Sequence, residues 1–207
     1  MKKIISAIIA IIFLVSYANA QKIHVGGKGG ANLSKIDATS FKNGYQLGYQ
    51  LGAWASIDFG KSGNIGIQPE VLFNQSNSQF STSFKDTYTQ IPNLINPFGD
   101  SSVKLNYLTI PVLLRINASK FLTINAGPQF GILIDDKQNL IQNGNTAFKS
   151  GDLSALIGAQ VNLGSFHVYG RYSIGLSNIN NLGTTDAGTQ DKWKNQQAQI
   201  GVGFKIL

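Results

Sequence analysis

Two long runs of strand-forming residues, joined by a short polar turn, restrict what this chain can fold into. The runs cover residues 103–116 and 121–134, and the segment 117–120 between them is rich in turn-forming residues. From residue 122 to 134, apolar side chains alternate with small or polar ones. Each run is longer than an ordinary strand of about five or six residues. Long strands with one apolar face and one polar face are typical of a transmembrane β-barrel.

The N-terminus predicts export from the cytoplasm. Lys2 and Lys3 precede an apolar run over residues 4–15, and Ala-Asn-Ala at residues 18–20 matches the A-x-A cleavage pattern. A retained helical anchor is the alternative, but this apolar run is too short to span a bilayer comfortably. We therefore predict a cleaved signal peptide over residues 1–20 and a barrel domain over residues 21–207.

Composition excludes several other classes of protein. The chain has no cysteine, which excludes both a thioether-linked lipid anchor and a disulfide-stapled secreted domain. No apolar run of transmembrane-helix length follows residue 20. The formal net charge is +7, but the lysines are scattered and arginine occurs only at positions 115 and 171, so no basic stripe for nucleic acid is present. We predict no nucleic-acid partner.

The same alternation predicts eight strands, and the connections between them are alternately long and short. Outer-membrane barrels have this layout, with short periplasmic turns and longer extracellular loops. The sequence therefore predicts an all-β, eight-stranded, antiparallel up-and-down transmembrane barrel. We expect a monomer in contact with outer-membrane lipid, with both mature termini in the periplasm. The predicted strands are residues 23–34, 46–59, 65–79, 103–116, 121–134, 151–163, 166–178 and a last strand after residue 194.

A soluble barrel of the lipocalin type is the alternative architecture. Such a barrel would have a polar outer face and an apolar interior. Here the residues expected to point inward are Gly, Ser, Asn, Gln and charged residues, which would make a poor soluble core. The pattern favours the membrane barrel.

Three prolines fall inside predicted strands. Proline has no amide hydrogen for the ladder, and Pro69, Pro111 and Pro128 are therefore expected to cause a bulge or a missing rung. The alternation also becomes indistinct around Leu113 and Leu114, which indicates a bulge near Pro111.

Five motifs carry a resemblance to a known family: VGGKGGANLS at 25–34, IQPEVLF at 67–73, LNYLTIPVLLR at 105–115, AGP at 126–128 and RYSIGL at 171–176. Together, and in this order, they resemble the PorT-like family of outer-membrane β-barrel proteins from Gram-negative bacteria. The resemblance implies an outer-membrane barrel, and the founding member of the family is associated with protein secretion. Thr109 stands where the family usually has an acidic residue.

Four charged residues are expected to face the lumen: Lys28, Glu70, Arg115 and Arg171. Charges inside a narrow barrel are costly unless they are paired, which predicts an ion-pair network. Glu70 and Arg171 lie at similar heights from the turns and form the best candidate pair. The network is interpreted as a plug that fixes the interior, because an eight-stranded barrel is filled by its side chains. The alternative interpretation is an ion path or a ligand site.

The sequence offers little for catalysis or metal binding. His24 and His167 are the only histidines, both are expected near the short turns, and no Ser-His-acid set emerges at one height. There is no metal-ligand spacing, and no glycine-rich loop precedes a helix, so Gly26 to Gly30 is interpreted as strand backbone. We predict no enzyme activity, no cofactor and no metal.

The long segment 80–102 is the best candidate surface for a protein partner. It contains Phe80, Phe84, Tyr88 and Phe98, and long loops with apolar residues either bind a partner or pack over the barrel mouth. We predict a non-enzymatic protein with a filled lumen and a structural or interaction role in the cell envelope. A narrow passive pore and a component that assists protein secretion are the alternatives.

Overall fold

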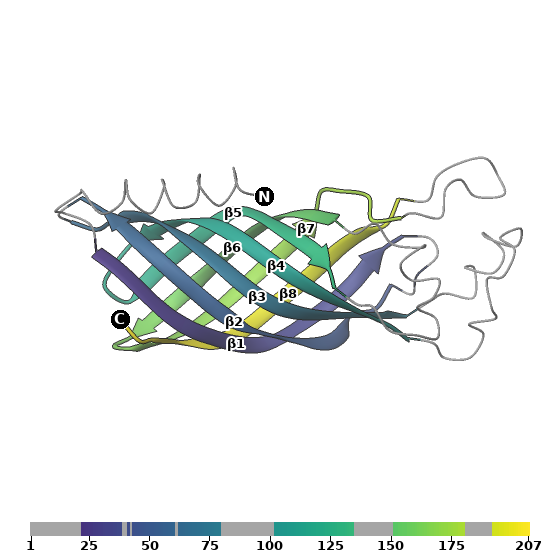
Figure 1. Cartoon of the computed structure of the whole chain (residues 1–207), viewed down its shortest axis with the longest axis horizontal. Helices are drawn as coiled ribbons and strands as arrows, with labels where there is room; N and C mark the ends of the chain where they lie inside the picture. The colour runs from purple at the N-terminus through teal and green to yellow at the C-terminus, as the bar shows by residue number, and fades with distance from the viewer. Residues whose placement is uncertain are drawn as a thin grey trace, which may run out of the picture.

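Eight antiparallel strands form a closed barrel in the computed structural model (Figure 1). Each strand pairs with the next, and β8 pairs with β1. The structure describes residues 22–38, 41, 43–60, 62–79, 102–134, 151–180 and 192–207. No helix in these ranges is long and apolar enough to cross a membrane. The strands are β1 (Lys22–Asp37), β2 (Gln46–Phe59), β3 (Ile65–Gln79), β4 (Ser102–Asn117), β5 (Leu122–Leu133), β6 (Gly151–Leu163), β7 (Phe166–Gly175) and β8 (Lys194–Lys205).

The short connections all lie at one end of the barrel, which we call the turn side. They are residues 60–64, 118–121 and 164–165, and the opposite end is the loop side. Gly60, Gly63 and Gly164 have φ near +65 to +70° (70°, 64° and 67°), a conformation that glycine adopts without steric cost and that closes tight turns. The C-terminus lies on the turn side next to the start of β1, where the Val25 amide donates to the Leu207 carbonyl at 2.9 Å (Figure 1).

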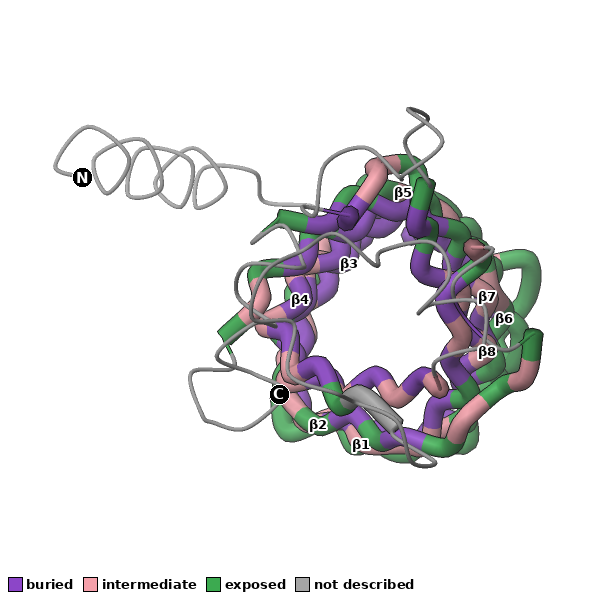
Figure 2. Tube along the Cα trace, turned by 90° about the vertical axis from the view of Figure 1, so that its right-hand side faces the viewer, coloured by how far each residue is buried: buried purple, intermediate pink, exposed green. Residues whose placement is uncertain are grey.

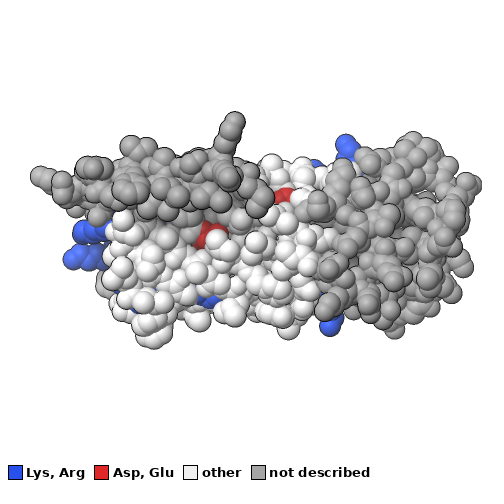
Figure 3. Space-filling view, viewed as in Figure 1, with Lys and Arg blue, Asp and Glu red and all other residues white. Residues whose placement is uncertain are grey.

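Burial alternates along the strands with a period of two, as predicted. Buried residues lie toward the inside of the barrel and exposed ones toward the outside (Figure 2). Leu47, Leu51 and Ile200 are 66%, 64% and 64% exposed on the outer wall, whereas Gln68 and Asn125 are fully buried. The middle of the outer face shown in Figure 3 carries few charged side chains. An apolar outside around a polar inside suits lipid and excludes the soluble barrel.

Aromatic side chains lie on the outer wall near both ends of the barrel. The rings of Tyr49 and Phe73 pack at a tilt on the loop-side half with centroids 5.8 Å apart, and those of Phe166 and Phe204 pack at a tilt on the turn side at 4.9 Å. Aromatic rings at these two levels are typical of the two membrane–water interfaces.

The three prolines interrupt the ladder without adding a residue. Pairing is missing at Pro69 between β2 and β3, at Pro111 between β3 and β4, and at Pro128 between β4 and β5. The pairing register is the same on both sides of each gap, so missing rungs are observed and the predicted bulge near Pro111 is wrong. Proline has no amide hydrogen, so the ladder loses one hydrogen bond there, but the pairing register of the strand does not change. Leu113 faces the lumen and Leu114 the lipid, so the alternation there is regular.

Candidate functional site

The carboxylate of Glu70, on β3, lies at the centre of the lumen. Arg171 on β7 binds it with two nitrogens, Nη1 to Oε2 at 2.8 Å and Nη2 to Oε1 at 2.7 Å. Lys28 on β1 places its ammonium 3.1 Å and 3.0 Å from the two oxygens. All three charged side chains are 0% exposed. The structure therefore brings together three of the four charges predicted to face the lumen, including the Glu70–Arg171 pair.

Tyr169 on β7 supports both cations. The Lys28 ammonium lies 3.9 Å from the centroid of its ring and the Arg171 guanidinium carbon 4.8 Å, distances at which a cation is attracted to an aromatic face. The ring fits because Gly30 and Gly201 pair directly across the β1–β8 seam. A Cβ atom at Gly30 would lie 2.9 Å from the Tyr169 hydroxyl, and one at Gly201 would overlap the same hydroxyl. Two glycines thus make room for one large side chain.

Arg115, the fourth predicted charge, is linked to the centre through an amide. Gln68 donates from Nε2 to Glu70 and accepts at Oε1 from the Arg115 guanidinium. Arg115 also lies 3.3 Å from Asp58 Oδ1 and donates to Asn117 Oδ1 at 3.3 Å. Asp58 is not among the four predicted lumen charges. Its alternation with the apolar residues of β2 and its place next to a short turn are the sequence signals that could have identified it.

The network leaves each of its charged groups with a charged or polar partner. Three cations, Lys28, Arg115 and Arg171, surround two carboxylates, Glu70 and Asp58. Burial of charge in a narrow interior is tolerated when every group is paired and hydrogen-bonded. This arrangement can hold five strands in fixed relative positions, because the charges come from β1, β2, β3, β4 and β7.

An apolar cluster lies at the loop side of the barrel. Trp193 and Ile179 are 0% exposed, and the Phe41 and Trp193 rings meet edge to face with centroids 5.0 Å apart. Ile36, at the loop-side end of β1, is also buried. The predicted strands end at residue 178 and resume after residue 194, so the sequence prediction missed this cluster. No period-two pattern marks it, because Phe41, Ile179 and Trp193 come from separate connections.

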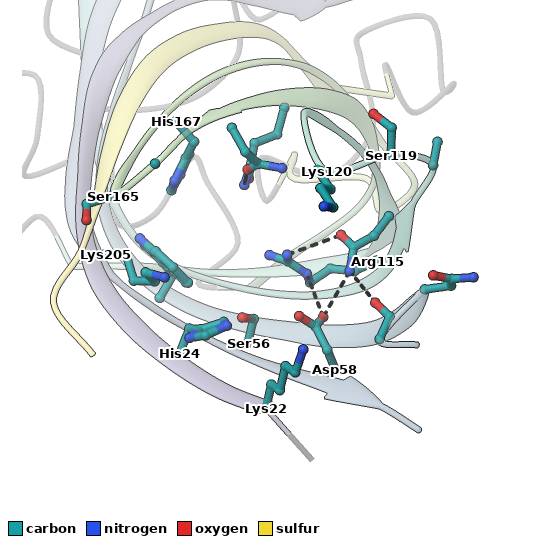
Figure 4. A pocket seen from close by; sticks show the side chains of 18 of the residues that line it. Lys22, His24, Ser56, Asp58, Arg115, Ser119, Lys120, Ser165, His167 and Lys205 are labelled. Atoms are coloured by element: carbon teal, nitrogen blue, oxygen red, sulfur yellow. Dashed lines mark hydrogen bonds and ion pairs between the residues drawn. The ribbon is translucent and has the colours of Figure 1, made fainter. Parts of the chain in front are cut away.

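A cavity of about 570 Å³ occupies the turn side of the lumen (Figure 4). Both histidines line it, in agreement with their predicted position near the short turns. His167 packs edge to face against Trp54 with ring centroids 5.2 Å apart. Neither His24 nor His167 has a side-chain hydrogen bond to a serine or a carboxylate within the described residues.

Two further predictions concern metals and the long loop. No group of three or more His, Cys, Asp or Glu side chains among the described residues is arranged to hold a metal ion. Phe80, Phe84, Tyr88 and Phe98, the candidate partner residues, lie outside the described residues.

The closed barrel of β1–β8 has an apolar outer wall and a charged interior filled by side chains. These features define the protein as an eight-stranded transmembrane β-barrel of the outer-membrane class. Residues 19–181 match the outer membrane protein beta-barrel domain family, and the chain belongs to this family. The predicted location in the outer membrane is confirmed by this membership.

Solved structures of three outer-membrane proteins are similar to this chain at low sequence identity. The attachment invasion locus protein Ail of Yersinia pestis, in complex with the heparin analogue sucrose octasulfate, is 11% identical, with a TM-score of 0.49 over 89% of this chain and 99% of Ail. Neisserial surface protein A is 10% identical, with a TM-score of 0.49 over 89% and 97%. OprG from Pseudomonas aeruginosa is 13% identical, with a TM-score of 0.43 over 88% and 95%. No curated protein matches the chain.

Proposed function

We propose that this protein is a non-enzymatic, monomeric outer-membrane barrel whose filled lumen serves stability and whose surface serves an interaction in the cell envelope. The observation that carries the proposal is the carboxylate of Glu70, held by four contacts from Lys28 and Arg171 in the middle of the lumen. A carboxylate that is buried and already paired with two cations cannot also bind a passing ion or take part in a reaction. The network is a plug.

The proposed orientation places the turn side in the periplasm and the loop side outside the cell. Short turns on one side and longer connections on the other support it, because outer-membrane barrels are built this way. Both ends of the barrel domain then face the periplasm, and residues 1–20 act as a signal peptide.

The absence of enzyme activity is part of the proposal. Catalysis by a nucleophilic serine needs a base within hydrogen-bond reach and a group that orients the base. His24 and His167 line the turn-side cavity together with Ser56, Ser165 and Asp58, but no serine–histidine hydrogen bond links them within the described residues. The proposal predicts that lipid A from overexpressing cells keeps its full set of acyl chains; a lost or added chain would contradict it.

We also propose that the chain belongs to the PorT-like group within its family. In support, each of the four predicted lumen charges falls in one of the motifs that carry the resemblance: Lys28, Glu70, Arg115 and Arg171. A part in protein secretion is therefore the second candidate function. Since the middle of the lumen is filled, such a part would depend on surface contacts and not on passage of a chain through the barrel.

A narrow passive pore is the alternative that conductance can test. We expect the purified protein in planar bilayers to give no steps above the background, and we expect Glu70→Ala to unfold at lower temperature without creating a conductance. Asp37→Ala is the control, since it removes a carboxylate from an exposed residue at the loop-side end of β1. Conductance steps in the wild-type protein that change in Glu70→Ala but not in Asp37→Ala would refute the plug.

The loop 80–102 is the proposed surface for a protein partner. Its apolar residues are the support, since apolar residues in a long connection favour a partner. We expect deletion of residues 84–98 to leave a barrel with heat-modifiable gel mobility, and to remove proteins that cross-link to the wild-type chain. Loss of membrane assembly in the deletion variant would instead assign the loop a structural role.

A further inference from the structure

The turn-side cavity carries an excess of positive charge. Four cationic side chains and one carboxylate line its volume of about 570 Å³. Cavities of about 300–1,000 Å³ are the usual size for small-ligand sites. The cationic residues are Lys22, Arg115, Lys120 and Lys205, and the carboxylate is that of Asp58.

The three lysines of the cavity are not neutralised. Arg115 pairs with Asp58 at 3.3 Å, which accounts for the single carboxylate. The ammonium groups of Lys22, Lys120 and Lys205 have neither an ion pair nor a hydrogen bond with any described residue. Three uncompensated charges of one sign around a common space repel one another, and an anion between them would remove this cost.

The lysines face the lumen and not the surrounding lipid. Side chains alternate between the two faces of a strand. Lys22 lies on the same face of β1 as its buried residues, and Lys205 lies on the same face of β8 as its buried residues. Lys120 belongs to the turn between β4 and β5, and Figure 4 shows Lys120 and Lys205 on opposite sides of the cavity. The charge therefore lies inside the rim of the barrel, where a dissolved ligand can reach it from the turn side.

Two buried polar atoms, from residues that line the cavity on β2 and β7, lack partners. Ser56 is 0% exposed and its hydroxyl has no hydrogen-bond partner. Nε2 of His167 is also buried without a partner. Buried polar groups are normally paired with protein or water, so these two atoms favour a polar over an apolar occupant of the cavity.

We propose that the turn-side cavity binds a compact, soluble anion with two or more negative charges, such as a pyrophosphate or polycarboxylate group. A cluster of like charges around a concave space raises the local concentration of counter-ions. Lysine ammonium groups bind such anions as point charges with rotatable donors. Pyrophosphate is small enough to enter the cavity and carries enough charge to contact more than one lysine. The proposal does not depend on the plug or on the partner loop.

Titration calorimetry with inorganic pyrophosphate tests the proposal on the whole barrel in a zwitterionic detergent. We expect saturable binding at low salt that weakens as the salt concentration rises, because screening acts on exposed charges. The triple variant Lys22→Gln, Lys120→Gln and Lys205→Gln is expected to weaken binding by about tenfold or more. Heat-modifiable gel mobility shows that the variant has folded. If the triple variant does not fold, Lys120→Gln and Lys205→Gln are measured singly, and each is expected to weaken binding.

The matched control removes the same number of charges at the other end of the barrel. Lys104, Lys192 and Lys194 are exposed and lie on the loop side, so replacing them with Gln changes the net charge equally but leaves the cavity intact. This control is expected to change the affinity for pyrophosphate by less than about twofold, since distant exposed charges are screened.

Three results would overturn the proposal. One is the absence of saturable pyrophosphate binding to the wild-type protein at low salt. Another is an equal loss of affinity in the two triple variants, which would indicate a response to net charge alone. The last is displacement of pyrophosphate when the detergent is replaced by bilayers that contain phosphatidylglycerol. Lipid head groups, and not a soluble anion, would then occupy the cavity.

Discussion

Glu70→Gln tests whether charge, and not shape, holds the middle of the lumen together. The substitution keeps the size of the side chain and one hydrogen-bonding oxygen. It removes the negative charge that Lys28 and Arg171 share at N···O distances of 2.7–3.1 Å. If the cations are stabilised mainly by that charge, Gln cannot replace Glu at this position.

The expected loss of stability follows from burial. Removing one partner of a buried ion pair typically costs about 3–5 kcal/mol, because the remaining charge stays buried without compensation. Here one carboxylate serves two cations with 0% exposed side chains, so we expect the upper half of that range, about 4–5 kcal/mol. With a urea dependence of about 2 kcal/mol per molar, the unfolding midpoint would fall by about 2 M.

Urea unfolding in detergent, followed by tryptophan fluorescence, measures this change. The chain has two tryptophans, Trp54 beside the turn-side cavity and Trp193 at the loop side, so the signal covers both ends of the barrel. The double variant Lys28→Met with Glu70→Gln is the decisive control. It removes one of the two buried cations that Glu70→Gln leaves without a carboxylate, and it is expected to be more stable than Glu70→Gln alone. A loss below about 1 kcal/mol in Glu70→Gln, or a double variant that is less stable still, would refute the electrostatic reasoning.

The remaining predictions concern the ring that supports the cations. Tyr169→Ala is expected to cost about 3–5 kcal/mol in unfolding free energy, as for other large buried rings, whereas Tyr169→Phe loses only the hydroxyl and about 1 kcal/mol. Urea midpoints of the two variants distinguish ring packing from hydrogen bonding. Gly201→Ala places a Cβ 2.6 Å from the Tyr169 ring carbon that bears the hydroxyl, and is expected to prevent assembly of a heat-modifiable barrel. Gly170→Ala, which meets nothing within 4 Å, is expected to assemble normally, and equal behaviour of the two would contradict this.

The strand order and the two faces of the barrel wall could be predicted from sequence because the lipid face requires apolar side chains and the lumen face polar or small ones. Every second residue of a strand must be apolar where it meets lipid, and this requirement leaves a period of two that can be read directly. The prolines show the limit of this reasoning. A missing amide hydrogen predicts a lost bond, but whether the strand also takes up an extra residue depends on its neighbours. At Leu113 and Leu114 the side chains have the same chemistry on both faces, so the pattern there says nothing about register.

The partners within the lumen were harder to predict than the faces. The alternation of side chains predicts that Lys28 and Glu70 face the interior, but contact between strands that are not neighbours depends on barrel tilt and side-chain reach. Lys28 on β1 reaches Glu70 on β3 across β2, and Gln68 joins two charged groups through one amide. Trp193 was missed for a different reason. It packs against residues of other connections, and such contacts leave no local periodicity.

The three levels of the lumen also limit how a bound anion could behave. An apolar cluster lies at the loop side, paired charges fill the middle, and the cationic cavity opens at the turn side. Passage beyond the cavity would require Arg171 to release Glu70, and breaking this buried pair has a cost of about 3–5 kcal/mol. If the proposed plug holds, an anion that enters at the turn side leaves by the same side. The cavity would respond to the concentration of the anion on that side alone, which is the behaviour of a binding site and not of a transport path.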